Sequence, residues 1–268
     1  MNRIVLIGCG AMGGAILSGC LAGGVWKKEE VVIKGRTRES SEGKARAFGV
    51  SAFSSGRDIK EADLVLLAVK PQVLPKVLQE LAKDRPRRVI SIAAGIPLAT
   101  LEASLPAETE VIRVMPNTPL SVGLGMSAIA AGKGVSKEFL DETKRIFSAL
   151  GEIEVGSEGQ LDQLGALSGA GPGYAFVMID ALADGGVRIG LRRELAIRAA
   201  AMALMGAAKL VLSSGRHPAA LRDEVTSPGG TTIAGIHAME EGGVRAALMN
   251  AVKAAKDRSD EMSIVNER

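Results

Sequence analysis

A proline, two adjacent glycines and four hydroxyl side chains stand together in the stretch TSPGGTTIAG, residues 226–235. Proline and paired glycines disfavour the middle of a helix or a strand, so we expect a loop that leads into a helix beginning near Thr231. Such a loop exposes backbone N–H groups without partners, and the helix dipole favours negative charge at that end. The stretch is therefore a candidate site for a small anion, although an ordinary helix cap has a similar composition.

A second glycine-rich stretch, GCGAMGG, follows a strand-like run at residues 2–7 and opens a small-residue helix. It places Gly8, Gly10 and Gly13 at the G-x-G-x-x-G spacing of a dinucleotide-binding turn. In such a turn the first glycine permits the tight bend, the second lets a pyrophosphate approach the backbone, and the third lets the helix pack on the sheet. The context favours a dinucleotide site over glycines that serve packing alone.

The turn after the second expected strand predicts which dinucleotide binds. An NAD site usually carries an acidic residue there, about 20 residues beyond the glycines, to bind the ribose hydroxyls. The segment IKGRTR instead carries Lys34, Arg36, Thr37 and Arg38. Cations and a hydroxyl suit a 2′-phosphate, so we expect NADP, with NADPH preferred and NADH possible; a solvated basic turn is the alternative.

Three further loops follow expected strands, and ligands of a doubly wound sheet bind beyond the carboxyl ends of its strands. These loops contain the segments AVKP, SIAAG and RVMPNTP. In the last of them Asn117 and Thr118 are candidates to face the nicotinamide, and a proline-bounded turn without a ligand is the alternative. The candidate cofactor-binding residues are Gly8, Cys9, Gly10, Ala11, Met12, Gly13, Arg36, Thr37, Arg38, Ala68, Val69, Lys70, Pro71, Ala93, Ala94, Gly95 and Asn117.

Charge and residue content argue against several other kinds of site. The formal net charge of +3 is too small to indicate nucleic-acid binding. Cys9 and Cys20 fit neither a disulfide framework nor a zinc site, and His217 and His237 are too few for a His-rich metal centre. We expect no metal, and a hydride transfer whose chemistry the cofactor supplies. We see no signal peptide and no uninterrupted membrane-spanning run, so we expect a cytoplasmic protein without a membrane partner.

Strand-like and helical segments alternate over residues 1–156, which predicts an α/β, Rossmann-like, doubly wound parallel sheet with helices on both faces. The expected strands are NRIVLI, EVVIKGR, DLVLLAV, RRVISIAA, EVIRVM, MSAIAAG and EIEV. Over residues 157–268 the periodicity is helical, which predicts an all-α C-terminal domain. Its long helices are rich in Ala and Gly and apolar on most faces, so we expect a second subunit to cover them.

The chain as a whole resembles the pyrroline-5-carboxylate reductase family over essentially its full length. The segments most specific to that family are SGAGPGYAFVMIDALADGGVRIGL at residues 168–191 and HPAALRDEVTSPGGTTIAGI at residues 217–236, supported by IGCGAMG, AVKP, SIAAG and MPNTP. The resemblance implies NAD(P)H-dependent reduction of the cyclic imine 1-pyrroline-5-carboxylate to L-proline, the last step of proline synthesis. It also implies a C-terminal dimerisation domain, with homodimers that often assemble into decamers.

The resemblance also gives the loop at residues 226–235 a role. It implies that Ser227, Gly229, Gly230, Thr231 and Thr232 bind the substrate, with backbone N–H groups on the carboxylate. Thr232 is the catalytic candidate and reaches the ring nitrogen. Three positions depart from the family pattern: Ser51 and Glu224 stand where many relatives carry asparagine, and Gly215 where some carry an acidic side chain.

Two other functions remain open from the residues. One is another NADP-dependent Rossmann and helical-bundle enzyme, such as a β-hydroxyacid dehydrogenase, which usually relies on a lysine in the second domain. Lys209 is the one lysine within residues 174–212, and it lacks the expected Gly-rich surroundings. The other is a non-catalytic NADP-binding sensor, against which the complete Ser227–Thr232 loop argues.

Overall fold

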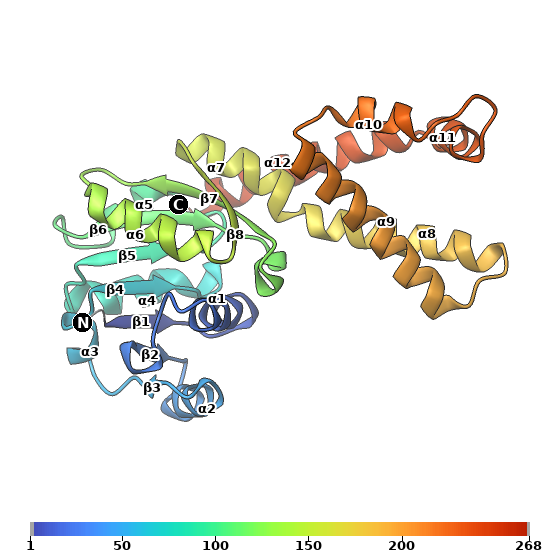
Figure 1. The fold of residues 1–268 in the computed structure, drawn as a ribbon. Coiled ribbons are helices and arrows are strands. Elements are labelled where there is room, and N and C mark those ends of the chain that lie inside the picture. The colour runs from blue at the N-terminus through green and yellow to red at the C-terminus, as the bar shows by residue number, and fades with distance from the viewer. Residues whose placement is uncertain (1–2, 267–268) are drawn as a thin grey trace. The chain divides into compact units, whose positions relative to one another are not determined.

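Packing divides the chain into two compact units, Met1–Ala170 with Ala255–Arg268, and Gly171–Ala254. The computed structural model describes residues 3–266, with side chains described for residues 3–262 (Figure 1). The boundary expected after residue 156 falls inside the first unit. Residues 157–170 pack with the sheet because Leu161 is buried in its core, and because the buried Arg113 of the sheet binds Glu158 and Asp162.

One sheet with the strand order β3-β2-β1-β4-β5-β6-β7-β8 forms the centre of the first unit (Figure 1). The order of strands in the chain reverses beside β1, which is where a doubly wound sheet opens a crevice for a ligand. The strands are β1 (Ile4–Ile7), β2 (Val31–Lys34), β3 (Ser51–Ala52), β4 (Leu64–Leu67), β5 (Arg88–Ser91), β6 (Glu110–Met115), β7 (Gly125–Ala131) and β8 (Gly151–Val155).

The sheet departs from the expected parallel arrangement at one pair of strands, because β7 runs antiparallel to β6. Parallel neighbours need a crossover of about a dozen residues or more, usually with a helix. The chain between Met115 and Gly125 is shorter than that and holds the short 3₁₀ turn η3 (Thr118–Val122). It therefore turns back on itself, while the other neighbouring strands pair in parallel.

Helices cover both faces of the sheet, as the sequence predicts. Leu6 and Leu66 are buried in one core with α1 and α6, whereas Val5 and Val65 are buried in the other with α4, α5 and α7. Burial on both faces explains why these strands are unbroken apolar runs. The helices of this unit are α1 (Ala11–Ala22), α2 (Arg38–Phe48), α3 (Arg57–Lys60), α4 (Leu74–Lys83), α5 (Leu98–Ala103), α6 (Lys137–Ser148) and α7 (Glu158–Leu164), with the short turns η1 (Lys28–Glu30), η2 (Pro71–Val73) and η4 (Gly165–Gly169).

The second unit is helical throughout, as expected. Two of its long helices, α8 and α9, pack through Ala183, Ala196 and Ala200, whose small side chains let the two helices approach closely. Turns and loops connect the other helices. The helices are α8 (Gly171–Arg188), α9 (Arg193–Ser214), α10 (Pro218–Glu224), α11 (Thr231–Glu241) and α12 (Val244–Asn266), the last of which continues into the first unit from Ala255.

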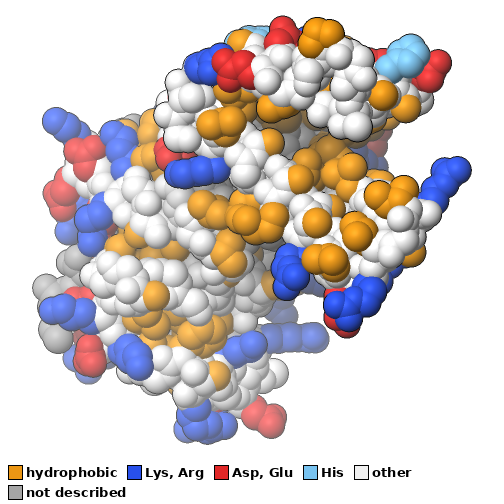
Figure 2. Space-filling view, turned by 45° about the vertical axis from the view of Figure 1, so that its right-hand side comes forward, with side chains coloured by type: hydrophobic (Ala, Val, Ile, Leu, Met, Phe, Trp, Pro, Cys, Tyr) orange, Lys and Arg blue, Asp and Glu red, His pale blue; other side chains and the backbone are white. Residues whose placement is uncertain are grey.

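Large apolar side chains on these helices are exposed in the single chain, and Figure 2 shows hydrophobic side chains gathered in patches on the molecular surface. Phe176 is 65% exposed, Val177 69% and Leu212 75%. By length and composition the segments Glu158–Arg188 and Arg193–Ser214 would be able to cross a membrane. A helix that is buried against another subunit can be equally long and apolar. Length and composition therefore do not distinguish a membrane-spanning helix from a helix in a subunit interface.

Candidate active site

The glycine-rich turn between β1 and α1 has the geometry of a phosphate-binding turn. Gly8 has a φ of +92°, and a Cβ placed on it would lie 2.7 Å from the Ala68 carbonyl oxygen, so the position admits glycine alone. A Cβ on Gly13 would lie 2.3 Å from the Gly8 carbonyl oxygen, which explains how closely α1 packs on the strand end. Beside Gly10 the space is open for at least 4 Å. The three glycines therefore have three different roles, and the open side at Gly10 is where an anion can approach.

The first turn of α1 is free to bind that anion. Gly10 caps the helix without a side-chain hydrogen bond, and the first turn contains no acidic residue. The helix has 12 residues, so its dipole favours negative charge at this end. The turn opens into a pocket of about 390 Å³, the glycine-turn pocket, lined by Gly10, Ala11, Met12, Ala68, Val69, Lys70, Ile92, Ala94, Met115, Pro116, Asn117, Thr118 and Gly169.

A second pocket, the basic pocket, lies at the carboxyl end of β2 and has a volume of about 430 Å³. Its lining is Lys34, Gly35, Arg36, Thr37, Arg38, Ser41, Glu42, Ala52, Phe53 and Ser54. The guanidinium of Arg38 binds Glu42 at 2.8 Å, whereas Arg36 is exposed and forms no ion pair within the described part of the chain. Arg36 is therefore the cation most readily available to a phosphate.

The remaining polar groups of the basic pocket are held in place by their neighbours. Thr37 caps α2 by accepting a hydrogen bond from the Ser40 N–H, which leaves the hydroxyl proton available as a donor. The ammonium group of Lys34 lies 3.7 Å from the Glu80 carboxylate and 4.8 Å from the centre of the Phe53 ring. This side chain is consequently shared between the pocket and an exposed carboxylate.

Asp58 holds in place Ser54, one of the residues that line the basic pocket. Its carboxylate accepts hydrogen bonds from the Ser54 N–H at 2.7 Å and the Ser54 hydroxyl at 2.8 Å. Burial alone raises the pKa of the Asp58 carboxyl, but the hydrogen bonds from Ser54 and Ser55 and the charge of Arg3 outweigh it, so the pKa lies below its ordinary value. The carboxylate stays ionised and holds Ser54 against the pocket.

Asn117 belongs to the wall of the glycine-turn pocket, and both polar atoms of its amide make hydrogen bonds within the protein. Its Oδ1 accepts a hydrogen bond from the Met126 N–H at 2.8 Å, and its Nδ2 donates one to the Ser168 carbonyl oxygen at 2.9 Å. The side chain joins the end of β6 to the start of β7 and to the π-helical turn Gly165–Gly169. Asn117 therefore lines this pocket, and each polar atom of its amide makes one hydrogen bond to the backbone.

In the second unit, the loop before α11 has the exposed donors that the sequence predicts. The helix begins at Thr231, its N-cap Gly230 has no side-chain hydrogen bond, and its first turn contains no acidic residue. Gly229 has a φ of +68°, and the Gly230 N–H closes a turn onto the Ser227 carbonyl oxygen at 3.0 Å. Within residues 3–266 the hydroxyls of Ser227 and Thr232 form no hydrogen bond, so both are free to meet a ligand.

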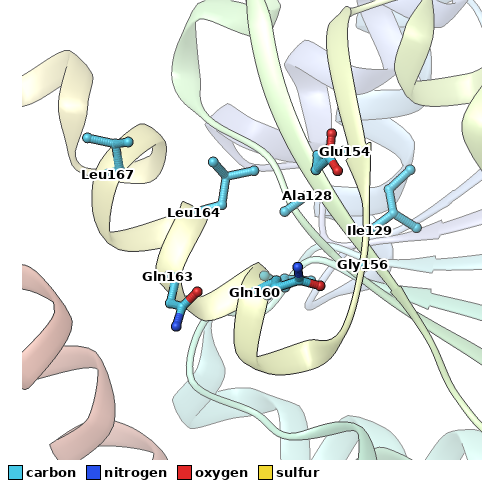
Figure 3. Close-up of a pocket in the computed structure, with 9 residues that line it drawn as sticks. Ala128, Ile129, Glu154, Gly156, Gln160, Gln163, Leu164 and Leu167 are labelled. Carbon is cyan, nitrogen blue, oxygen red and sulfur yellow. The ribbon is translucent and has the colours of Figure 1, made fainter.

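A third hollow, of about 260 Å³, lies between β7, β8 and α7 and is shown in Figure 3. Leucine, isoleucine and alanine side chains form most of its lining, with Glu154, Gln160 and Gln163 at its edges. It contains none of the residues predicted to bind a ligand.

The structure brings most of the predicted cofactor residues to two pockets at one edge of the sheet. Gly95 lines a neighbouring hollow of about 370 Å³ together with Ala94, Met115 and Gly169. The linings of these three pockets do not include Gly8, Cys9, Gly13, Pro71 or Ala93. Lining residues that were not among the predicted cofactor residues include Met115, Pro116 and Gly169 in one pocket and Phe53 and Ser54 in the other. Met115 and Pro116 lie within RVMPNTP, directly before Asn117, whereas Gly169 reaches the pocket only through tertiary folding.

Comparisons with known proteins identify the family of this chain. Residues 158–262 match the family model described as pyrroline-5-carboxylate reductase dimerisation, and residues 3–95 match the model described as NADP oxidoreductase, coenzyme F420-dependent. A pyrroline-5-carboxylate reductase of Arabidopsis thaliana is 42% identical, covering 97% of this chain and 95% of that protein. The Escherichia coli enzyme of the same name is 38% identical, covering 98% of each. The chain belongs to the pyrroline-5-carboxylate reductase family.

Solved structures of pyrroline-5-carboxylate reductases have the same fold as this chain. The Coxiella burnetii structure matches with a TM-score of 0.89 and 32% identity, covering 98% of both chains. A Plasmodium falciparum pyrroline carboxylate reductase with NADP bound matches with a TM-score of 0.88 and 30% identity, also over 98% of both chains. The reductase fold therefore extends over both units of this chain, and a family member binds NADP.

Proposed function

We propose that this protein reduces 1-pyrroline-5-carboxylate to L-proline with NADPH. The observation that carries the proposal is the pair of anion-accepting helix starts: α1 beside the open face of Gly10, and α11 behind the Pro-Gly-Gly loop. The reaction needs these two kinds of site, one for a pyrophosphate and one for a carboxylate. Membership of the reductase family, whose relatives match over nearly the full chain, supports the same reaction.

The two pockets of the first unit fit an NADP molecule. The open face of Gly10 and the uncapped start of α1 suit the pyrophosphate. The basic pocket suits a 2′-phosphate, with Arg36 unpaired, Thr37 able to donate and Arg38 in reach once it leaves Glu42. The glycine-turn pocket, with Val69, Ala94, Met115 and Asn117 in its wall, suits the nicotinamide. NADPH, when bound, supplies the hydride that adds to the imine carbon.

The loop Ser227–Thr232 has the properties needed to hold and orient the substrate. Backbone N–H groups at the start of α11 bind the carboxylate, which fixes the position of the five-membered ring. The Thr232 hydroxyl hydrogen-bonds the ring nitrogen. As the hydride adds to the imine carbon, the electron pair of the C=N π bond moves to the nitrogen, which is protonated and ends as the secondary amine of proline. The proton is already on the imine, so Thr232 orients the ring without acting as a strong acid.

We further propose that the protein functions as a homodimer in the cytoplasm, with decamers as a possible higher assembly. Apolar side chains on α8 and α9 are exposed in the single chain, and residues 158–262 match a dimerisation model. Both observations support a second copy of this chain that packs on these helices. Cys9 and Cys20 are both free and buried, which suits a reducing compartment.

A turnover assay tests this proposal against its alternatives. The purified protein is incubated with NADPH and 1-pyrroline-5-carboxylate, NADPH oxidation is followed, and L-proline is identified as the product. Oxidation of a β-hydroxyacid with NADP⁺, without turnover of the imine, would instead indicate a β-hydroxyacid dehydrogenase. Binding of NADPH without turnover of either substrate would indicate a sensor.

A further inference from the structure

The turn Gly165–Gly169 is π-helical, a conformation that is rare and concentrated at functional sites. Its defining bond runs from the Ala170 N–H to the Gly165 carbonyl oxygen at 3.3 Å. The turn ends where the first compact unit ends, and the chain continues directly into α8. Gly169 lines the glycine-turn pocket, so the turn supplies part of the surface on which the cofactor is proposed to bind.

Glycines bring this turn into close contact with Met115. A Cβ placed on Gly165 would lie 3.2 Å from Met115 Cγ, and one on Gly169 would lie 3.4 Å from Met115 Cε. Met115 itself lines the glycine-turn pocket. A methionine side chain is flexible, so the place it takes depends on what packs against it. The position of the turn therefore determines the shape of the pocket wall at Met115 and Gly169.

Asn117 is the side chain that holds the turn in this position. It is 8% exposed, and its Nδ2 binds the Ser168 carbonyl oxygen at 2.9 Å, within the turn itself. Its Oδ1 binds the Met126 N–H at 2.8 Å, which anchors the amide to β7. Each polar atom of the amide thus makes one positioning hydrogen bond to the backbone.

We infer that Asn117 is a positioning residue for the nicotinamide end of the cofactor: it acts by fixing the π-helical turn and, through it, Met115. This inference rests on the proposed function, because it assumes NADPH in the glycine-turn pocket. The inference also predicts that Asn117 affects binding of the nicotinamide end of the cofactor and not binding of its 2′-phosphate end. The basic pocket, where the 2′-phosphate is proposed to bind, contains no residue of this turn and does not include Asn117.

The variant Asn117→Asp tests the inference with little change in shape. One carboxylate oxygen still accepts the Met126 N–H, whereas the other replaces the donor and faces the Ser168 carbonyl oxygen, where two acceptors repel each other. Loss of this buried hydrogen bond should weaken NADPH binding on the order of tenfold. Binding of adenosine 2′,5′-bisphosphate, which has the 2′-phosphate but no nicotinamide, should change less than about twofold. Ser121→Ala, which removes an exposed hydroxyl bond in the adjoining turn, is the control and should leave both affinities unchanged.

The same measurements show whether the inference fails. Equal NADPH affinity in Asn117→Asp and the unchanged protein would overturn it, and so would an equal loss for both ligands, which a general structural defect would produce. If thermal unfolding shows that Asn117→Asp does not fold, Gly165→Ala replaces it. That variant keeps the Asn117 bonds but displaces Met115, and it must give the same selective loss of NADPH binding or the inference is wrong. Turnover of the imine by the unchanged protein is measured in parallel, so that failure of the proposed function is recognised separately.

Discussion

At the scale of single residues, the structure separates two arginines that the sequence treats alike. Arg36 and Arg38 both line the basic pocket, but Arg38 is bound to Glu42 and Arg36 has no ion pair among the described residues. A phosphate must compete with Glu42 for Arg38, whereas Arg36 is available without competition. The sequence predicts the basic turn, and the side-chain partners within it become visible only after folding.

The first prediction is that Arg36→Ala impairs NADPH use more than Arg38→Ala does. A charge-assisted hydrogen bond contributes about 1.5–3 kcal/mol, so Arg36→Ala should raise the Michaelis constant for NADPH about tenfold to a hundredfold. The Michaelis constant for NADH should change little, because NADH lacks the 2′-phosphate. Steady-state kinetics with both cofactors provide the measurement. A similar change for NADPH and NADH would place the 2′-phosphate elsewhere.

The second prediction concerns the hydroxyl of Thr232, which has no partner within residues 3–266. Thr232→Ser retains the hydroxyl and should retain most of the activity. Thr232→Ala removes one oriented hydrogen bond to the ring nitrogen. Losing one preorganised hydrogen-bonding group costs about 10²–10³ in turnover, and a neutral positioning group should lie at or below the lower end of that range. The turnover number with saturating NADPH and imine is compared for both variants. Equal activity of the alanine and serine variants would exclude the proposed role.

At the scale of elements, the sequence predicts the long strands and helices. The strands are buried on both faces of the sheet and are therefore unbroken apolar runs, and the long helices are apolar on most of their faces. It does not predict β3 (Ser51–Ala52), α3 (Arg57–Lys60) or α5 (Leu98–Ala103), which are too short to show a period. It also misses the antiparallel direction of β7, which depends on the length of one connection, and the role of Gly169, which depends on how the π-helical turn packs on the sheet.

One element-scale feature outside the site supports the sheet from its other end. The guanidinium of Arg88, on β5, is buried and binds Glu110 on β6 at 3.0 Å and Glu142 on α6 at 3.5 Å. It also lies 5.4 Å from the centre of the Phe139 ring. Burial alone raises the pKa of Glu110, but hydrogen bonds from Ser136 and Arg88 outweigh it, and the pKa lies below its ordinary value.

The third prediction follows from this cluster. Glu110→Gln leaves the buried Arg88 with less compensating charge and should lower the free energy of unfolding at neutral pH. The loss should be smaller than the about 3–5 kcal/mol typical of an uncompensated buried charge, because Glu138 and Glu142 still bind Arg88. The Glu110 carboxyl has a lower pKa in the folded protein than in the unfolded chain. Its contribution is therefore complete above the unfolded value of about 4.3 and is lost as the pH falls through the folded value. Glu110→Gln should accordingly lose less stability than the unchanged protein on acidification. Chemical denaturation at several pH values measures this, with the exposed Glu29→Gln as control; identical acid dependence in Glu110→Gln and the unchanged protein would contradict it.

At the scale of the whole molecule, the exposed apolar surface of the helical unit indicates that another subunit buries it. Val177, Met205 and Leu212 are each at least half exposed in the single chain. Large hydrophobic interfaces of this kind are typical of obligate dimers. The sequence predicts the need for a partner from the composition of these helices, but the contacts that would form between subunits depend on geometry that one chain does not contain.

The fourth prediction is that the protein is an obligate homodimer or a larger assembly of dimers. Sedimentation velocity at micromolar concentration should show no folded monomer, and dilution that dissociates the assembly should abolish turnover. The apolar helices would then be exposed to water, so dissociation should also lower the thermal stability. A folded and fully active monomer at micromolar concentration would refute the prediction.

The central claim is that the glycine turn and the basic pocket bind the cofactor, whereas the Ser227–Thr232 loop binds the carboxylate of the substrate. Gly230→Val tests it most directly, because a Cβ at this position lies 3.1 Å from the Ser227 carbonyl oxygen and 3.3 Å from its hydroxyl, so a larger side chain must distort the loop. Calorimetric titration should show weaker binding of L-proline and nearly unchanged binding of NADPH, and kinetics should show a raised Michaelis constant for the imine. Gly235→Ala, in the same helix with open space around its Cβ, is the control. Loss of NADPH binding with L-proline binding intact would contradict the account.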